Sequence, residues 1–393
     1  MLSPVLLVLL STLAALLPLS TDPLTPALPA LAASFGVDAP EAQSVMRSFI
    51  LGVAFGQLIY GALGDRFGRR PVLIIGTATY VLATFATLFA PSIDTLAALR
   101  FVQALGAAAA TVLSRAVVRD LLEREAAAHA LALMGVGMGV GVLLAPVLGG
   151  LAADWLGWRG PLLLMALCGI VATAGTLWRL PETVPALDPG ALSPAGLGRA
   201  FGRLLQSRRY LSYVANCITG YGGVFLFLTG ASFVLMGEFG ISAAGFGLWF
   251  AFATCGYITG SLISSRIARR MGSDHALWMG LLGTLSGGML MTFLALTGVH
   301  HPLAVTGPMV IYTFGWGFQQ PQAQAAALSV YPEMAGRASA MLGFLQMVGA
   351  MLAALFYARI GDGTALPLAA SMAGLALLGV IIRLLSDWRV RKP

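Results

Sequence analysis

One acidic residue, Asp22, lies inside a long apolar stretch near the start of the chain, whereas the others fall in polar segments or near the ends of apolar ones. A carboxyl group surrounded by hydrocarbon is costly, and such a residue is a candidate for function. Because burial disfavours its charged form, the group can take up and release a proton. Asp22 is therefore our candidate proton carrier. The structural alternative is that Asp22 caps a helix that is interrupted at Pro23.

Arg100 is the candidate partner of Asp22, because it also lies in an apolar stretch. With a rise of about 1.5 Å per residue, Asp22 is about 27 Å from the inner start of its predicted helix, and Arg100 is about 8 Å from the outer start of another. The two depths agree in a hydrocarbon core about 30 Å thick. The alternative is that Arg100 lies at the membrane interface and extends its guanidinium into water.

The elements that would position these residues are helices in a membrane. Hydrophobic residues make up 58% of the 393 residues and charged residues 10%, which is unlike a soluble domain. A spanning helix needs about 20 mainly apolar residues. No basic segment precedes the first helix, so we interpret it as uncleaved rather than as a signal peptide. The sequence predicts an all-α membrane protein with twelve helices, approximately 4–33, 42–64, 71–90, 95–118, 127–153, 160–180, 210–236, 243–267, 275–298, 303–327, 336–358 and 365–386.

The basic residues predict how these helices are oriented. If the N-terminus is inside, all 23 Lys and Arg residues except Arg47, Arg100, Arg159 and Arg359 fall on the cytoplasmic side, a strong positive-inside bias. An even number of helices then places both termini in the cytoplasm. The net charge of +7 does not indicate a nucleic-acid partner, because the basic residues are spread between apolar stretches.

The longest polar interruption, residues 181–209, contains several prolines and arginines and is typical of a linker. It predicts an N-terminal six-helix bundle over 1–180 and a C-terminal six-helix bundle over 210–393. The segment 61–70, between the second and third helices, has a weaker echo at 260–270, between the eighth and ninth. An echo at matching places indicates parallel repeats with a substrate site at their interface near the membrane midplane.

The segment 61–70 carries the most specific motif. Glycines permit a tight turn, and an aspartate among arginines can form an ion-pair latch at the cytoplasmic face; the alternative is a basic turn that only sets topology. The segment resembles the signature between helices 2 and 3 of the major facilitator superfamily, although Gly64 stands where that family usually has Ser or Ala. The residues that carry the resemblance are Gly61, Asp65, Arg66, Gly68, Arg69 and Arg70.

Further matches resemble one branch of that superfamily, the bicyclomycin and chloramphenicol resistance (Bcr/CflA) drug:proton antiporters. They are Asp22 together with residues 26–29, and the segments 100–106, 115–120, 180–183 and 145–150. In the segment 145–150, Pro146, Gly149 and Gly150 look like the antiporter motif. The resemblance implies the twelve-helix major facilitator fold, a bacterial inner membrane, a monomer, and drug export driven by the proton gradient without a cofactor. The chain lacks the aromatic residue that the branch commonly has just after Asp22, which leaves the substrate open.

The fifth predicted helix is rich in glycine, and small residues allow helices to approach closely in lipid. Pro146 removes a backbone hydrogen bond and can bend this helix. The glycines concerned are Gly135, Gly137, Gly139, Gly141, Gly149 and Gly150.

Several polar and aromatic residues within the predicted helices are candidates for a substrate cavity. Taken singly, each can equally be a packing residue or hydrogen-bond between helices. As a group they favour a neutral or zwitterionic small molecule. They are Gln57, Gln103, Asn216, Tyr221, Phe225, Trp316, Gln319, Gln320 and Gln346.

Other functions are less well supported. The three cysteines and four histidines lack the spacing of a metal site, so we expect none. No P-loop occurs, and an intramembrane enzyme would need clustered acids, histidines or cysteines that the sequence lacks. A channel or sensor is a further alternative. We therefore expect a proton-coupled exporter that works by alternating access; the runner-up is a dedicated exporter of an endogenous metabolite such as a siderophore or amino-acid derivative.

Overall fold

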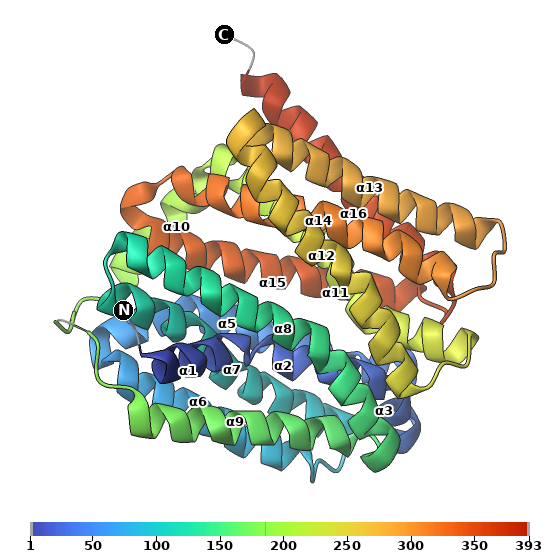
Figure 1. The fold of residues 1–393 in the computed structure, drawn as a ribbon, viewed down its shortest axis with the longest axis horizontal. Helices are drawn as coiled ribbons and strands as arrows, with labels where there is room; N and C mark the ends of the chain where they lie inside the picture. Colours follow the sequence, from blue (N-terminus) through green and yellow to red (C-terminus); the bar gives the residue numbers. More distant parts are fainter. Residues whose placement is uncertain (1–2, 185, 391–393) are drawn as a thin grey trace. The chain divides into compact units, whose positions relative to one another are not determined.

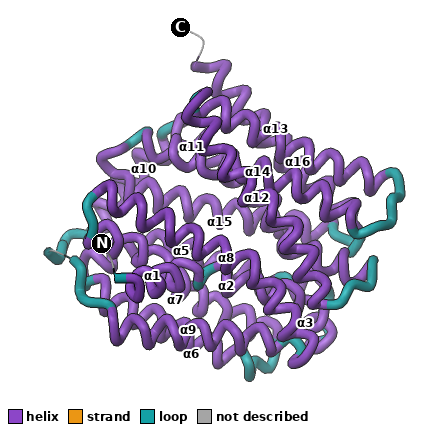
Figure 2. The backbone as a smooth tube through the Cα atoms, viewed as in Figure 1, coloured by secondary structure: helices purple, strands orange, loops and turns teal. Residues whose placement is uncertain are grey.

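The computed structural model describes residues 3–184 and 186–390, and two compact units divide the chain, Met1–Arg199 and Ala200–Pro393. Within the described residues all regular structure is helical (Figure 2). The boundary between the units lies inside the predicted linker. The predicted cytoplasmic residues Arg391 and Lys392 lie outside the described residues.

The helices of the first unit follow the predicted ranges with one exception at the start (Figure 1). The sequence predicts a single helix over 4–33, whereas the structure divides it and bends it by 50° between Pro4–Ala15 and Pro18–Phe35. Prolines cause the break, because a proline has no backbone N–H to donate and its ring clashes with the preceding turn of a helix. The four pieces are α1 (Pro4–Ala15), α2 (Pro18–Thr21), the 3₁₀ helix η1 (Asp22–Ala27) and α3 (Leu28–Phe35).

The rest of the first unit consists of one four-residue helix and several longer ones, and the ends of the longer helices agree with the predicted ones within about four residues. Glycines set the closest contacts: a Cβ on Gly52 or Gly56 of α5 would meet α7, and a Cβ on Gly76 of α6 would meet Ala109 of α7. This packing of small residues suits helices in lipid. These helices are α4 (Ala39–Ala42), α5 (Ser44–Phe67), α6 (Arg69–Thr87), α7 (Ile93–Leu121), α8 (Arg124–Leu156) and α9 (Arg159–Arg179).

The second unit also follows the predicted ranges. A Cβ on Gly256 or Gly260 of α12, or on Gly280 or Gly287 of α13, would meet the backbone of α14, so α14 packs closely between these two helices. The elements are α11 (Arg208–Ser232) with a π-helical end η2 (Phe233–Glu238), α12 (Ala243–Met271), α13 (Ser273–Leu296), α14 (Leu303–Ser329), the short η3 (Pro332–Met334), α15 (Ala335–Ile360) and α16 (Ala365–Val390).

The sequence echo at 260–270 lies within α12 rather than between two helices as predicted, but a glycine turn of the same kind follows it at Gly272. Gly68 separates α5 from α6 with φ of 97° and ψ of 150°, and Gly272 separates α12 from α13 with φ of 91° and ψ of 154°. Both glycines adopt a positive φ that L side chains rarely take. The second and third long helices of each unit are therefore joined by the same backbone turn.

The linker is not entirely without structure. Residues 194–206 form α10 (Pro194–Gln206), which the sequence analysis did not predict. Its buried residues, Ala200 and Leu204, lie one turn apart, while Arg199 and Arg203 point elsewhere on the helix. An amphipathic pattern of this kind is visible in the sequence, but prolines and glycines around it favour a loop.

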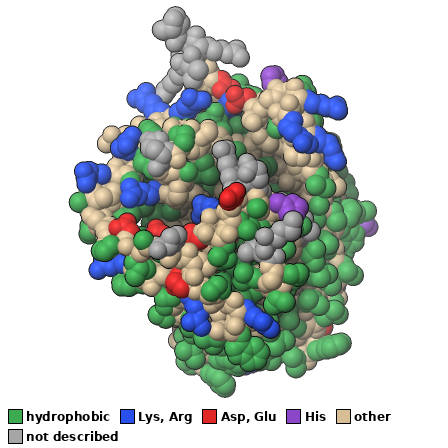
Figure 3. Space-filling model, turned by 60° about the vertical axis from the view of Figure 1, so that its left-hand side comes forward, with side chains coloured by type: hydrophobic (Ala, Val, Ile, Leu, Met, Phe, Trp, Pro, Cys, Tyr) green, Lys and Arg blue, Asp and Glu red, His purple; other side chains and the backbone are tan. Residues whose placement is uncertain are grey.

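Ten described helices are long and apolar enough to cross a membrane, and the bent first pair makes eleven if it is one span. The helix α14 is long enough, at 27 residues, but falls below that apolarity because it contains several glutamines. Hydrophobic side chains cover much of the face drawn in Figure 3. Exposed residues such as Phe89 at 81% and Trp178 at 86% are expected where lipid replaces water.

Candidate functional site

Arg100, on α7, is fully buried in the first unit, with an exposed fraction of 0%. Its guanidinium donates to the Ser20 carbonyl at 2.6 Å and to Gln103 Oε1, and lies over the Phe49 ring at 4.2 Å. Its Nε has no hydrogen-bond partner. Arg100 therefore does not extend to the interface, which was the alternative prediction.

Two further hydrogen bonds link the residues around Arg100 to α6. Gln103 Nε2 donates to Thr84 Oγ1 at 2.6 Å, and Ser20 Oγ shares a hydrogen bond with the Tyr80 hydroxyl at 2.7 Å. The sequence analysis missed Ser20, Tyr80 and Thr84. The available signal was a polar pair four residues apart in an apolar stretch, which places both side chains on one helix face.

The helix break explains how Arg100 reaches the Ser20 carbonyl. In a 3₁₀ turn that carbonyl would accept the N–H three residues later, but this residue is Pro23, which has no N–H. The carbonyl can therefore accept from the guanidinium. The sequence analysis predicted Arg100 and identified Pro23 as a possible interruption, but did not connect them.

Asp22 is buried at the first position of η1, with an exposed fraction of 7%. Its Oδ1 accepts the Thr21 hydroxyl at 2.7 Å, and η1 has no side-chain cap. Within the described residues Asp22 forms no ion pair with Arg100; the arginine instead binds the carbonyl two residues earlier in the chain. The structure thus brings Arg100 to the Asp22 segment without joining the two side chains.

The glycine face of α8 packs against this broken segment. The Cβ positions of Gly137 and Gly141 lie 3.2 Å from Ser11 Cβ and 3.6 Å from Ala15 Cβ. A Cβ on Gly149 would overlap the backbone of Pro23, next to Asp22. Gly135 and Gly139 face open space instead. Of the predicted antiporter motif, Gly149 therefore lies where only glycine permits the observed approach, and Pro146 and Gly150 are also buried.

The motif between α5 and α6 forms an ion-pair cluster. Arg69 pairs with Asp65 at 2.6 Å and with Asp120, at the end of α7, at 2.9 Å. Arg69 Nη1 also donates to the Gly61 carbonyl at 3.4 Å. The predicted ion pair between Asp65 and a neighbouring arginine is present, and the structure adds Asp120. We call Asp65, Arg69 and Asp120 the Arg69 cluster.

The other two arginines of the motif lie outside the Arg69 cluster. Arg66 places its guanidinium 5.3 Å from the Phe67 ring centroid. Arg70 donates to the Leu177 carbonyl near the end of α9 at 3.1 Å. The predicted latch therefore involves one arginine of the three.

The cavity candidates of the second unit form two hydrogen-bonded groups. Gln319 donates to the Asn216 carbonyl at 2.7 Å and accepts from Thr284 at 3.3 Å. Gln320 accepts from Trp316 at 3.3 Å and donates to Gln346 at 3.2 Å. The first group is buried between helices, which fits a packing role.

Aromatic rings surround the second group. The Trp316 ring lies 6.1 Å from Tyr221 and 4.3 Å from Tyr257, and Tyr221 lies 6.3 Å from Phe225. Tyr257, on α12, was not among the predicted residues. Gln57, on α5 of the first unit, is half-buried.

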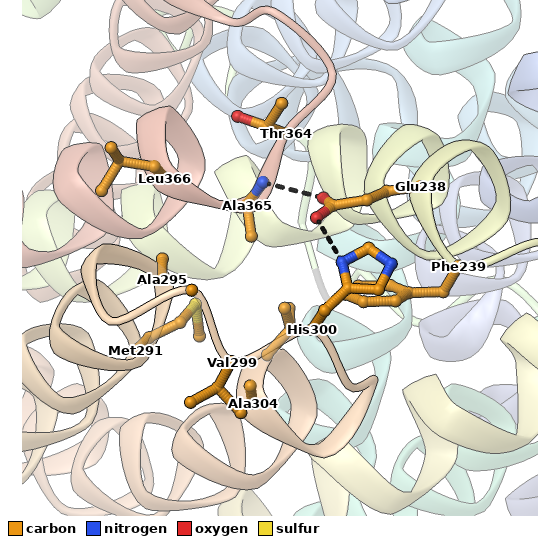
Figure 4. Close-up of a pocket in the computed structure, with 12 residues that line it drawn as sticks. Glu238, Phe239, Met291, Ala295, Val299, His300, Ala304, Thr364, Ala365 and Leu366 are labelled. Atoms are coloured by element: carbon orange, nitrogen blue, oxygen red, sulfur yellow. Dashed lines mark hydrogen bonds and ion pairs between the residues drawn. The ribbon is translucent and has the colours of Figure 1, made fainter.

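A cavity of about 150 Å³ occurs at one end of the second unit and contains none of the predicted residues (Figure 4). Glu238 lies at its edge, where Oε2 accepts the backbone N–H of Ala365 at 3.1 Å and Oε1 is 3.3 Å from His300 Nδ1. The His300 ring packs on Phe239 at 4.7 Å. These contacts join the end of η2, the loop before α14 and the start of α16.

Comparison with known proteins identifies the family. The Major Facilitator Superfamily profile matches residues 8–354. The chain is 28% identical over 379 residues to a bicyclomycin resistance protein homolog of Haemophilus influenzae, covering 95% of this chain and 93% of that protein. It is 30% identical over 353 residues to a chloramphenicol resistance protein of Pseudomonas aeruginosa, covering 88% and 79%.

The fold has solved counterparts. A D-xylose-proton symporter superposes with a TM-score of 0.74 at 16% identity, over 95% of this chain and 96% of that one. Identity this low bears on the fold alone. Together with the sequence matches, it shows that the chain is a multi-pass membrane transporter that belongs to the major facilitator superfamily and is similar to its bicyclomycin and chloramphenicol resistance proteins.

Proposed function

We propose that this chain is a proton-coupled efflux transporter of the bacterial inner membrane, an antiporter that exports small drug-like molecules. The names of its relatives support drug export, since they are a bicyclomycin resistance protein homolog and a chloramphenicol resistance protein. Transport proceeds by alternating access of two six-helix halves. It uses the proton gradient and no cofactor, in a monomer whose two termini are cytoplasmic.

The observation that carries this proposal is a buried acid at a helix break, on the same segment that a buried arginine contacts. Asp22 and Arg100 are 7% and 0% exposed. The proton joins and leaves the Asp22 carboxylate, while the Ser20 carbonyl and Gln103 hold the guanidinium in place. A substrate that competes with the proton for Asp22 and Arg100 would couple export to proton entry.

The acidic residues support a neutral or zwitterionic substrate. In the second unit the described acids lie at helix ends or in loops, as Glu238, Asp274 and Asp362 do. Deep in this unit a permanently charged cation would therefore lack an acidic partner, and burying an unpaired charge is costly.

The test uses membrane vesicles from an efflux-deficient host that expresses the full chain. Asp22→Asn should abolish proton-coupled export while the protein remains inserted, because the amide cannot exchange protons. Asp94→Asn is the matched control, since Asp94 is an exposed acid in the first turn of α7. Wild-type proton coupling in the Asp22 variant would show that the carrier is elsewhere.

A second measurement tests the substrate class with two probes, neutral chloramphenicol and the cation tetraphenylphosphonium. We expect export of chloramphenicol and little export of the cation. The reverse result contradicts the proposed substrate class. If neither is exported and expressing cells release a metabolite instead, dedicated metabolite export replaces drug export.

A further inference from the structure

The segment 180–183, directly after α9, has no part in the proposed proton coupling, yet one of its side chains makes an unusual number of contacts. The Glu182 carboxylate accepts the backbone N–H groups of Arg69 at 2.9 Å and Arg70 at 3.2 Å. It also accepts those of Thr183 at 2.8 Å and Val184 at 3.1 Å. The start of the linker is thereby tied to the start of α6.

The geometry is that of a helix cap supplied from far along the chain. Arg69 and Arg70 are the first two residues of α6, whose N–H groups have no partner within the helix. A negative charge there is favourable. Gly68 leaves room for it, because a Cβ at this position would lie 3.0 Å from Glu182 Cδ and would overlap Oε2.

The linker also contacts both acids of the Arg69 cluster. Thr183 Oγ1 donates to Asp120 Oδ2 at 3.2 Å, and this is the oxygen that accepts Arg69 Nε at 2.9 Å. The backbone N–H of Asp188 donates to the Asp65 carbonyl at 3.0 Å. The arginine and its two acids are therefore each held by a residue between 182 and 188.

The charge state of Glu182 suits this role. Burial opposes ionisation, but the N–H groups of Val184, Thr183, Arg69 and Arg70 outweigh it and hold the pKa of the Glu182 carboxyl below its usual range. Its contribution to stability is present above the ordinary glutamate pKa of about 4.3. It is lost as the pH falls through the lower folded value. The carboxylate is therefore charged near neutral pH.

We propose that Glu182 is a positioning residue of the Arg69 cluster: it clamps the first turn of α6, so that Arg69 stays between Asp65 and Asp120. The first residues of the linker are then a structural part of the cluster. This inference concerns contacts inside the first unit and does not depend on what the protein transports.

The first experiment measures hydrogen exchange of the full chain in lipid nanodiscs at pH 7, and needs no substrate. In Glu182→Gln one oxygen is replaced by an amide donor that faces other donors. We expect the protection of the Arg69 and Arg70 amides to fall by about tenfold, or about 1.4 kcal/mol, with the interior of α6 unchanged. Unchanged protection of these two amides would overturn the proposal.

Two variants serve as references for this measurement. Glu182→Asp keeps the charge and should restore part of the protection. Glu123→Gln is the matched control, because Glu123 precedes α8 and makes no side-chain cap. It should leave the amides at the start of α6 unaffected.

A double-mutant cycle on the transport rate separates positioning from general stabilisation. If Glu182 acts through Arg69, adding Glu182→Gln to Arg69→Ala should slow transport no further, because contacting residues are non-additive. Additive losses would mean that Glu182 acts independently and would refute the positioning role. If Glu182→Gln does not reach the membrane, Glu182→Asp takes its place in the cycle, with the same two outcomes.

Discussion

The packing of α8 against the broken first helix can be tested with one methyl group at two glycines. In Gly149→Ala the new Cβ would lie 2.6 Å from the Pro23 carbonyl carbon, and closer to two other backbone atoms of Pro23. In Gly139→Ala, on the same helix, it would meet nothing within 4 Å. The second substitution therefore controls for the change in helix propensity.

The expected cost follows from these contacts. Carbon atoms prefer separations of about 3.5–4.0 Å, so α8 and the Pro23 segment must separate by about 1 Å. Backbone atoms cannot turn aside, and overpacking of this kind costs about 1–3 kcal/mol. Alanine in place of glycine within a helix returns about 0.5–1 kcal/mol in both variants. The difference between Gly149→Ala and Gly139→Ala is therefore the packing cost alone, about 1–3 kcal/mol.

Thermal unfolding of the two purified variants measures this difference. In a domain of 150–250 residues each kcal/mol lowers the Tm by about 2–4 °C. We expect Gly149→Ala to unfold at a lower temperature than Gly139→Ala, and to transport more slowly because the segment that carries Asp22 is displaced. Equal Tm values and equal transport would refute the close contact between α8 and Pro23.

Two further substitutions test polar groups in the two units, Arg100 in the first and His300 in the second. Arg100→Ala should impair transport more than Arg100→Lys, because lysine keeps the charge without the planar fork; transport by the alanine variant at the wild-type rate would leave Arg100 without a functional role. The His300 ring lies 3.3 Å from Glu238 Oε1, and Glu238 Oε2 accepts the Ala365 N–H, so removing the ring should loosen the carboxylate that holds this amide. Protection of the Ala365 amide against hydrogen exchange should therefore be lower in His300→Ala than in the wild type. His301→Ala, the control in the same loop, should leave it unchanged, and equal protection in the His300 variant would contradict the assignment.

The helices themselves could be predicted because lipid leaves few options. A backbone without water must satisfy its own hydrogen bonds, and helices of about 20 apolar residues do so. The long described helices accordingly begin and end within about four residues of the predicted positions. The first helix was the exception: its prolines were visible, but whether a proline bends or breaks a helix depends on the groups that satisfy the freed carbonyls.

The candidate residues were predictable by type and their partners were not. Arg100 and Arg69 were identified as charges in or beside apolar stretches, but a charge in a sequence does not reveal which side chain or carbonyl it meets. The Ser20 carbonyl accepts from Arg100 because Pro23 has no N–H to offer that carbonyl, and because packing places Arg100 of α7 beside it. Glu182 is 113 residues from Arg69 in the chain, yet it lies against it.

The sequence by itself determined the approximate extent of the long helices, because apolar length and turn residues are local properties of the chain. It also determined where charge would be costly. Only the tertiary structure decided that Asp22 and Arg100 do not pair directly, that Gly149 rather than Gly139 must lack a side chain, and that the linker completes the Arg69 cluster. Those outcomes depend on the rotation and separation of packed helices, which are set by contacts between residues far apart in the chain.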